Sequence, residues 1–289
     1  SAALGWMVAS SGMRPIRQVT RVAASMSAKS LKERIPLAPV PKELQQMVLS
    51  FNAMLSRLDD AFVRLSNFSA DIAHELRTPV SNLMTHTEVV LSRKRNIEDY
   101  EDNLYSNLDD LKRMSRMIDD MLFLAKSDNG LITHENKPID LVEVVEKLLE
   151  YYRLLADERG IELKVSGRGS VRGDVLMLHR AISNLLSNAL RYTSEGKTIS
   201  VEILQKEMSV LVVVENHGEP IAPEHLEKLF DRFYRVDPAR REGSPSNAGL
   251  GLSITRSIIE AHDGKIWCTS CDGKTAFHLE FRSVDLKVS

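Results

Sequence analysis

A long helical seam between residues 55 and 83 constrains the fold of this chain more than any other feature. Apolar or small residues recur there at alternating spacings of three and four: Leu55, Leu58, Phe62, Leu65, Ser69, Ile72, Leu76, Pro79 and Leu83. This spacing is typical of a helix that packs along one stripe against other helices, as in a coiled coil. We therefore expect one helix that begins near residue 42, continues past Pro79 and ends near residue 92.

A second helical pattern follows a short polar turn at residues 93–96. Its apolar positions are Leu104, Leu108, Leu111, Ser115, Ile118, Leu122 and Ala125, widened by Met114, Met117 and Met121. Two long helices joined by a short turn form an antiparallel hairpin. Because this stripe is wider than one hairpin can cover, we expect two copies of the chain to pair as a four-helix bundle, which predicts a homodimer.

His74 lies between seam positions, so the first helix should turn it away from the seam toward solvent. It could be an ordinary surface histidine, a metal ligand or a nucleophile. The metal role lacks a second ligand at helical spacing. The nucleophile is plausible because Glu75 could orient the imidazole or take its proton. Thr78 lies one turn further on the same face, and Pro79 can kink the helix just beyond it.

The first residues read as the end of a membrane helix. Leu4–Val8 is a short apolar run that contains a tryptophan, and Arg14 and Arg17 follow it. Such a run followed by arginines is typical of the cytoplasmic end of a membrane span, although a frayed tail is the alternative. These residues alone leave the two interpretations open. Upstream transmembrane helices missing from this sequence, an inner-membrane location for the full-length protein and a cytoplasmic location for this portion are what the family resemblance given below implies.

Residues 14–62 then show a helix, an extended connector and a second helix. An amphipathic pattern runs from Pro15 to Leu31, three prolines fall in Pro36–Pro41, and the next helical pattern begins near Lys42. This order resembles a HAMP signalling module. The Pro-Ile pair at residues 15–16 and the Phe-Asn-Ala-Met stretch at residues 51–54 match its pattern.

Beyond residue 137 the pattern changes to short strands alternating with helices. Strands are expected at 139–141, 161–165, 171–173, 198–204, 210–214, 265–270 and 275–281, and helices at 141–158, 175–192, 224–230 and 250–262. This order predicts an α+β domain in which helices cover one face of a mixed sheet. Residues 231–248 form a charged loop that could fold over a ligand as a lid.

Composition excludes several classes of function. The formal net charge of −2 gives no sign of a nucleic-acid-binding protein. The two cysteines, Cys268 and Cys271, have the CxxC spacing, but the partners for a zinc site are missing. On a strand, residues three apart point to opposite faces, which also argues against a shared metal or redox role.

Two polar clusters in the C-terminal region suggest a phosphate site. Asn184 and Asn188 are four residues apart on one helix, and Arg191 follows one turn later. They could simply bond each other, but amide oxygens also bind Mg²⁺ beside a nucleotide, and an arginine neutralises phosphate. Gly249 and Gly251 directly precede another helix, where backbone can approach an anion closely.

Taken together, these blocks resemble the sensor histidine kinases. Residues 69–79 resemble the H box, 184–192 the N box, 216–221 the G1 box, 229–235 the F box and 247–252 the G2 box. With the HAMP-like stretch, the resemblance covers nearly the whole chain. The amino-acid sequences of the H box and of Asn188–Thr193 resemble those of the heavy-metal (copper/silver-type) branch in particular.

The resemblance implies a multidomain protein with an all-α N-terminal part and a C-terminal α+β two-layer sandwich of the histidine-kinase ATPase type. The all-α part comprises a HAMP-like coiled coil and a dimeric four-helix bundle. The expected divisions are residues 1–13 for the membrane helix end, 14–62 for the HAMP-like module, 63–128 for the dimerisation and phosphotransfer hairpin, 129–137 for a linker, 138–283 for the ATP-binding domain and 284–289 for a tail.

The resemblance also implies a role for each matching residue. It makes His74 the phosphoacceptor, Glu75 its acid–base partner, and Thr78 a residue that helps to position water when phosphate is removed from the partner response regulator. Asn188 matches the Mg²⁺ ligand. The implied ATP contacts are Asn184, Asn188, Arg191, Tyr192, Asn216, Gly218, Arg235, Gly249, Leu250, Gly251 and Leu252.

The G1 block departs from the family pattern at two positions. Asn216 stands where an aspartate usually accepts a hydrogen bond from the adenine amino group, and its amide oxygen accepts without carrying charge. Pro220 stands in place of the second glycine and stiffens that turn. Two rival functions remain beside the kinase. An ATP hydrolase is possible because the C-terminal domain resembles a nucleotide fold shared with ATP-driven chaperones and mismatch-repair ATPases, although His74 with Glu75 argues against it. A catalytically inactive dimeric scaffold is supported by Asn216 alone.

Overall fold

The computed structural model describes residues 32–37, 42–133, 135–236 and 249–282. The chain divides into two compact units, residues 1–82 and 83–289, which we describe separately. The helix expected at residues 15–31, most of the proline-rich connector, the greater part of the lid loop and the C-terminal tail lie outside the described residues. Among the residues described, no helix has the length and apolar content that a bilayer crossing requires.

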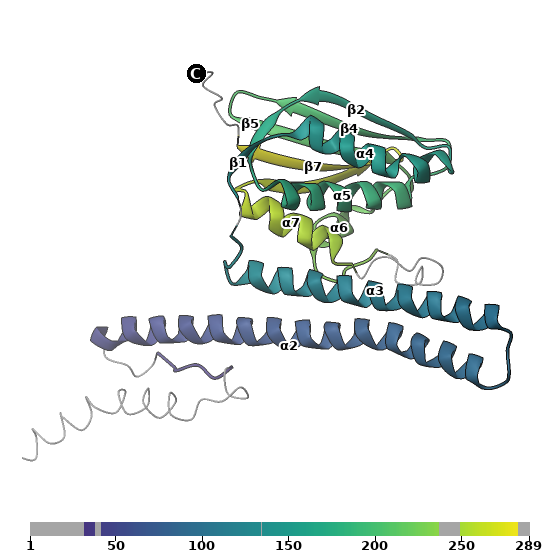
Figure 1. Ribbon diagram of the computed structural model, residues 1–289. Coiled ribbons are helices and arrows are strands. Elements are labelled where there is room, and N and C mark those ends of the chain that lie inside the picture. The colour runs from purple at the N-terminus through teal and green to yellow at the C-terminus, as the bar shows by residue number, and fades with distance from the viewer. Residues whose placement is uncertain (1–31, 38–41, 134, 237–248, 283–289) are drawn as a thin grey trace, which may run out of the picture. The chain divides into compact units, whose positions relative to one another are not determined.

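The long first helix is confirmed. Helix α2 spans Lys42–Leu91 and contains Pro79 without ending there (Figure 1). In the first unit, the Asn52 side chain accepts a hydrogen bond from the Ile35 backbone N–H (3.0 Å) and donates one to the Ile35 carbonyl (2.9 Å). Ile35, Val48 and Leu55 are buried. Asn52 therefore anchors the residue directly before the proline-rich connector on α2.

The second unit begins with the last turns of α2 and helix α3 (Ile97–Asp128). The Asn96 side chain caps α3 by accepting a hydrogen bond from the Asp99 N–H (2.8 Å). The Asn107 amide donates to the Thr87 hydroxyl (3.2 Å), which joins the last turns of α2 to the first turns of α3. The structure thus confirms the turn predicted at residues 93–96, with α2 ending at Leu91 and α3 beginning at Ile97.

The rest of this unit is an α+β domain built on a mixed sheet. Five strands lie in the order β2 (Glu162–Arg168), β4 (Thr198–Gln205), β5 (Ser209–His217), β7 (Lys274–Arg282) and β6 (Lys265–Cys271), and β1 (Lys137–Asp140) pairs with β3 (Ser170–Gly173). Only the β2–β4 pairing within the five-stranded sheet is parallel.

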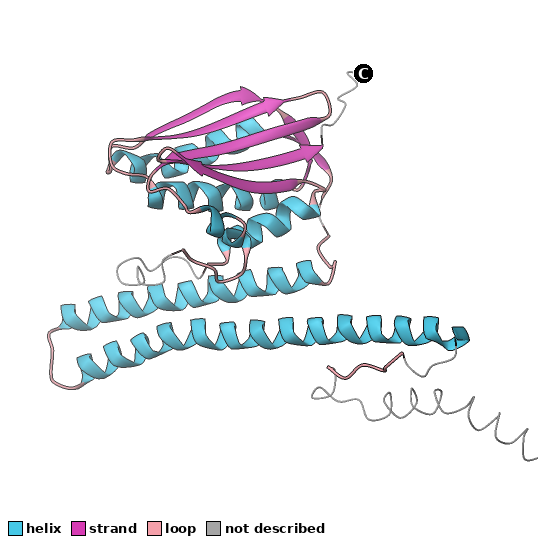
Figure 2. Ribbon diagram, turned by 180° about the vertical axis from the view of Figure 1, so that it is seen from behind, coloured by secondary structure: helices cyan, strands magenta, loops and turns pink. Residues whose placement is uncertain are grey.

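Three helices cover one face of this sheet and leave the other face open (Figures 1 and 2). They are α4 (Leu141–Asp157), α5 (Val175–Tyr192) and α7 (Gly251–Ala261), with the short α6 (Pro223–Leu226) and the 3₁₀ turn η1 (Lys228–Phe230) beside α7. The predicted fold class, helices on one face of a mixed sheet, is confirmed.

The core lies between this sheet face and the helices. Alternate residues of β5 are fully buried, as are the inward residues of α5 and α7; the set comprises Val210, Val212, Val214, Leu178, Ile182, Leu185 and Ile258. On β6, Cys268 is buried and Cys271 is exposed, which confirms that they point to opposite faces. Burial raises the pKa of the Cys268 thiol to about 12, so it stays protonated and unreactive.

The start of α5 is fixed by two polar side chains. The Asp174 carboxylate accepts hydrogen bonds from the N–H groups of Leu176 (2.9 Å) and Met177 (3.1 Å). The Asp174 N–H donates to His262 Nε2 (3.0 Å), and His262 Nδ1 donates to the Ile258 carbonyl (2.7 Å). His262 thereby connects the end of α7 to the start of α5.

Replacing Asp174 tests how far this cap stabilises the domain. Although burial opposes its charge, backbone N–H donors lower the pKa of the Asp174 carboxyl below its ordinary value of 3.8. We expect Asp174→Ala to lower the free energy of unfolding by about 1 kcal/mol at pH 7. Asp174→Asn, which keeps an acceptor oxygen, should lose less.

The stability that the Asp174 carboxylate contributes should decrease as the pH falls. A carboxyl with a lowered pKa in the folded state contributes stability that is present above its unfolded pKa and is lost as the pH falls through the folded pKa. The stability difference between the wild-type chain and Asp174→Asn should therefore shrink below about pH 3.8. Urea unfolding of the three proteins between pH 3 and 7 measures it, and a pH-independent difference would contradict the account.

Candidate functional site

The polar face of α5 is the centre of the candidate site. The opposite face of this helix is buried at Leu178, Ala181, Ile182, Leu185, Leu186, Ala189 and Leu190. Because a helix repeats every 3.6 residues, burying that set leaves Asn184 and Asn188 together on the other side, half-buried. The structure thus places the two amides on one face, as the sequence predicts.

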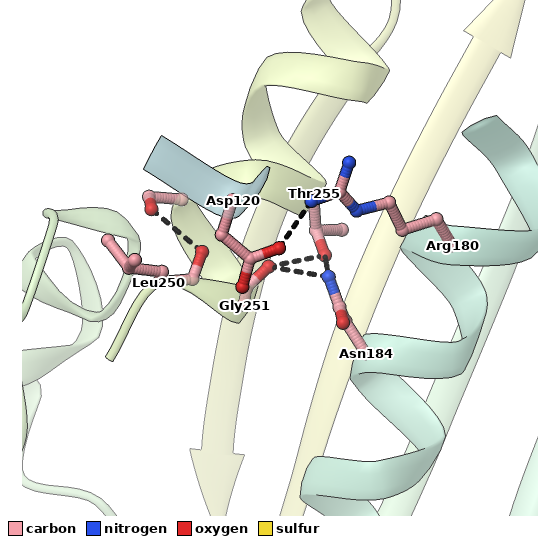
Figure 3. Close-up of polar contacts among 7 residues, drawn as sticks. Asp120, Arg180, Asn184, Leu250, Gly251 and Thr255 are labelled. Carbon is pink, nitrogen blue, oxygen red and sulfur yellow. Dashed lines mark hydrogen bonds and ion pairs between the residues drawn. The ribbon is translucent and has the colours of Figure 1, made fainter. Parts of the chain in front are cut away.

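Asn184 joins α5 to the first turn of α7. Its side-chain nitrogen donates a hydrogen bond to the Gly251 carbonyl (3.0 Å) and lies 3.5 Å from the Thr255 hydroxyl oxygen, which itself donates to Gly251 O (2.9 Å) (Figure 3). Two sequence blocks that are 67 residues apart therefore meet at this point. The sequence gives Asn184 as a candidate ligand contact, and the structure adds that it positions the start of α7.

The N-terminus of α7 is suited to an anion. Leu250 occupies the N-cap position and makes no side-chain capping hydrogen bond. Among the residues that the structure describes, none caps the first N–H groups of α7 with a side chain, and the helix dipole favours a negative charge there. A β-carbon at Gly251 would meet the Asn184 side chain at 3.6 Å, an ordinary contact, so the packing of the chain itself does not require glycine here.

Gly249 closes the base of the lid loop. It has φ +70°, and a β-carbon there would lie 2.8 Å from the Phe233 backbone. The Phe233 N–H donates to the Gly249 carbonyl (3.0 Å), and Phe233 itself has φ 61°. The two ends of the loop therefore meet beside α7, and only glycine fits at Gly249 without strain.

Asn188 and Arg191 lie further along α5. Among the residues described, none forms a hydrogen bond with the Asn188 side chain, which leaves its amide oxygen available. The Arg191 guanidinium lies 5.8 Å from the centre of the Tyr192 ring. Within the described ranges, no group of three His, Cys, Asp or Glu residues could hold a metal. A Mg²⁺ ion here would therefore depend on Asn188 and on the oxygens of a ligand, a donor set that suits it.

The G1 block packs against the end of α5. Asn216 lies within β5, opposite Ile199 of β4 and Thr275 of β7, and is 4% exposed. A β-carbon at Gly218 would lie 2.2 Å from the Tyr192 carbonyl oxygen, so this turn and α5 are in tight backbone contact.

The remaining predicted contacts lie near the start of α7 and of the loop. Leu250 is buried, Leu252 is half-buried in the first turn of α7, and Arg235 is half-buried at the beginning of the loop. Among the described residues, the partners of the Asn184 side chain are Gly251 and Thr255, not Arg235 or Leu252. The structure thus brings the α5 and α7 blocks together directly and places Arg235 at the beginning of the loop.

The candidate acceptor lies in the other unit. His74 and Thr78 are exposed on α2, while Glu75 is half-buried and Pro79 is buried. The outward orientation predicted for His74 is therefore found. Glu75 directly follows His74, so a carboxyl side chain occupies the next position of the same helix.

Sequence reasoning missed two links between α3 and this site. The Arg180 guanidinium forms an ion pair with Asp120 of α3 (Figure 3). It also lies 4.6 Å from the centre of the Phe123 ring. Arg232, at the start of the lid loop, pairs with Asp128. Arg180 lies four residues before Asn184, a spacing that could have identified it as a member of the same helix face. The sequence around Asp120 and Asp128, in contrast, does not predict their partners.

Arg159 was also missed. Its guanidinium donates to the carbonyls of Leu190 and Thr193, and so caps the C-terminal end of α5. Because Arg159 comes from the loop between α4 and β2, only the fold brings it to this position.

Two glycine variants test which glycine of the site is required by close backbone packing. Gly218→Ala would press a β-carbon against the Tyr192 carbonyl oxygen, so we expect the free energy of unfolding to fall by about 1–3 kcal/mol. Gly251→Ala meets no such obstacle and should leave that free energy unchanged or slightly higher. Urea unfolding of both variants measures this, and equal losses would show that the close approach at Gly218 has been misjudged.

Three family descriptions match the chain. The HAMP domain matches residues 7–60, the His Kinase A (phospho-acceptor) domain residues 64–130, and the histidine kinase-, DNA gyrase B- and HSP90-like ATPase residues 173–285. Two solved structures share the fold. The histidine kinase AdeS of Acinetobacter baumannii has a TM-score of 0.60 at 23% identity and covers 73% of this chain and 98% of its own.

The second structure is the histidine kinase ThkA in complex with the response regulator protein TrrA. It has a TM-score of 0.62 at 22% identity and covers 79% of this chain and 64% of its own. At these identities, both likenesses are evidence for the fold alone.

Curated relatives are closer in sequence. Sensor protein CopS of Pseudomonas syringae pv. tomato is 61% identical over 86% of this chain and 51% of its own length. Sensor histidine kinase CusS of Escherichia coli K12 is 52% identical over 92% of this chain and 55% of its own. The chain thus spans about half the length of the curated relatives it matches. From its three matched domains and these relatives, the chain belongs to the sensor histidine kinases, in the heavy-metal branch of that family.

Proposed function

We propose that this chain is the kinase portion of a two-component sensor that phosphorylates itself on His74 with ATP and passes the phosphate to an aspartate of a response regulator. The observation that supports it most is the hydrogen bond from Asn184 to the Gly251 carbonyl. It brings the N and G2 blocks together beside a helix N-terminus whose N-cap residue, Leu250, makes no side-chain capping bond, which is a favourable place for phosphates.

The proposed reaction is a phosphoryl transfer to nitrogen. A neutral ring nitrogen of His74 forms a bond to the γ-phosphorus as the bond to the ADP oxygen breaks, and Glu75 takes the imidazole proton. His74 is exposed and Glu75 is half-buried beside it, which suits these roles. Catalysis then depends mainly on positioning and on neutralising phosphate charge.

On the nucleotide side, the chain offers both cationic side chains and neutral amides. Mg²⁺, when bound with ATP, supplies charge neutralisation on the phosphate oxygens. Asn188, whose side chain bonds to none of the described residues, would hold it through its amide oxygen, and Arg191 lies one turn further along the same helix. Gly249 and Gly251 would let the loop base and the start of α7 approach the phosphates.

The exposed apolar surface of α3 supports a homodimer. The apolar stripe of α3 is exposed, with 66% of Leu104, 46% of Leu108 and 57% of Leu122 accessible. Apolar stripes of this length are normally covered by another helix surface. A second copy, paired through the hairpin, would bury it in a four-helix bundle.

The wider setting is proposed from family membership. We infer that the full-length protein is held in the inner membrane by helices upstream of this sequence, with the present portion in the cytoplasm. Its branch of the family favours a heavy-metal ion as the signal. Thr78, exposed one turn beyond His74, would serve in removing phosphate from the regulator when that signal is absent.

Incubation with γ-labelled ATP and Mg²⁺ tests this function. We expect acid-labile label on the chain, because a phosphate on a histidine nitrogen is lost in acid. The label should disappear in His74→Gln and persist in His86→Gln, a matched change at an exposed histidine of the same helix. Release of free phosphate without labelled protein would instead support the ATP hydrolase. If the reaction yields neither labelled protein nor free phosphate, the result supports the inactive scaffold.

Asn216→Asp tests the altered adenine contact. A carboxylate accepts a stronger hydrogen bond from the adenine amino group than an amide does, so we expect the dissociation constant for ATP to fall by about threefold to tenfold. Because Asn216 is 4% exposed, the charge should also lower the stability of the protein without nucleotide. Calorimetric titration and thermal unfolding measure the two effects; equal or weaker ATP binding by the variant would refute the proposed contact.

A further inference from the structure

Arg180 extends the polar face of α5 by one turn beyond the residues that the sequence motifs mark. It lies four residues before Asn184 and eight before Asn188, so the three side chains follow one another along one face. Asn184 is hydrogen-bonded to the Gly251 carbonyl, at the start of α7. Arg180 therefore places a cation one helical turn from the proposed phosphate site.

In the structure, this cation is engaged by α3. The Arg180 guanidinium is paired with the Asp120 carboxylate and lies 4.6 Å from the centre of the Phe123 ring. In Figure 3 the Arg180 side chain extends toward Asp120 while Asn184 reaches Gly251 from the same helix. The two side chains of the pair are 33% and 34% exposed, so a competing ligand can reach them from solvent.

The electrostatics of the Arg180–Asp120 pair favour replacement of the Asp120 carboxylate by a phosphate group. Burial raises the pKa of the Asp120 carboxyl although Arg180 acts to lower it, which shows that the ion pair only partly offsets the loss of water around this charge. A polyphosphate carries more negative charge than a carboxylate. Its oxygens also match the forked donors of a guanidinium.

We propose that Arg180 is a phosphate-binding residue of the nucleotide site and that Asp120 of α3 competes with the nucleotide for it. This rests on the proposed function, because it requires ATP to bind between α5 and α7. The competition makes Arg180 the point where nucleotide binding and the contact of α3 with this domain are coupled. By linkage, each weakens the other by the same factor.

Nucleotide affinity of the full chain tests the proposal. A nonhydrolysable ATP analogue with Mg²⁺ is titrated by calorimetry into the wild-type chain, Asp120→Asn and Arg180→Gln. Asp120→Asn removes the competing charge and should lower the dissociation constant by about threefold to fivefold, as expected for a partly exposed pair. Arg180→Gln removes a charge-assisted contact and should raise it by about tenfold.

The double variant and two controls test whether the effect of Asp120→Asn acts through Arg180. In the Arg180→Gln background, Asp120→Asn should have no effect, because no cation is left to compete for. Asp119→Asn removes the same charge from the exposed neighbouring residue of α3 and should not change affinity. Asp120→Glu keeps the competing carboxylate and should bind like the wild type, which guards against a folding defect in the Asn variant.

Three results would overturn the proposal. These are unchanged affinity in Asp120→Asn, tightening by Asp120→Asn that persists without Arg180, and equal tightening by Asp119→Asn. Each would show that Asp120 acts as a general negative charge or not at all. If the wild-type chain fails to bind the analogue, the proposed function fails with it, whereas binding without these shifts refutes only the role of Arg180 and Asp120.

Discussion

The hydrogen bond between the Asn184 side chain and the Gly251 carbonyl is the contact on which the candidate site depends. It can form because α5 buries one apolar face against the sheet and presents the other, polar face to the start of α7. The same arrangement brings the base of the lid loop, closed by Phe233 and Gly249, to this point. One amphipathic helix thus supplies both the centre of the core and the face that would bind phosphates.

Elements with strong local signals could be predicted from the sequence. The bounds of α5 match the expected 175–192 because an N-capping aspartate precedes an uninterrupted 3.6-residue apolar period. Strand β5 was expected to end at residue 214 but continues to His217, because residues 215–217 pair with β7 across the sheet. That pairing joins segments about sixty residues apart, and no local pattern encodes it.

The candidate site likewise combines residues with local sequence signals and residues that depend on distant partners. The N and G2 blocks were recognisable because their asparagines and glycines have characteristic spacing, and the structure joins two of them directly. Arg180, Arg159 and His262 were not identified, since each acts through a partner distant in the sequence: Asp120, the end of α5 and the Asp174 backbone. Ordinary charged or histidine residues gain such roles only from the fold.

Hydrogen–deuterium exchange with and without a nonhydrolysable ATP analogue and Mg²⁺ tests most directly whether these pieces form one nucleotide site. A ligand held at the start of α7 should slow exchange of the backbone N–H groups in its first turn, residues 251–254, and at the loop base near Phe233 and Gly249. The open face of the sheet should not change. Saturating binding that leaves the first turn of α7 unprotected would contradict the account.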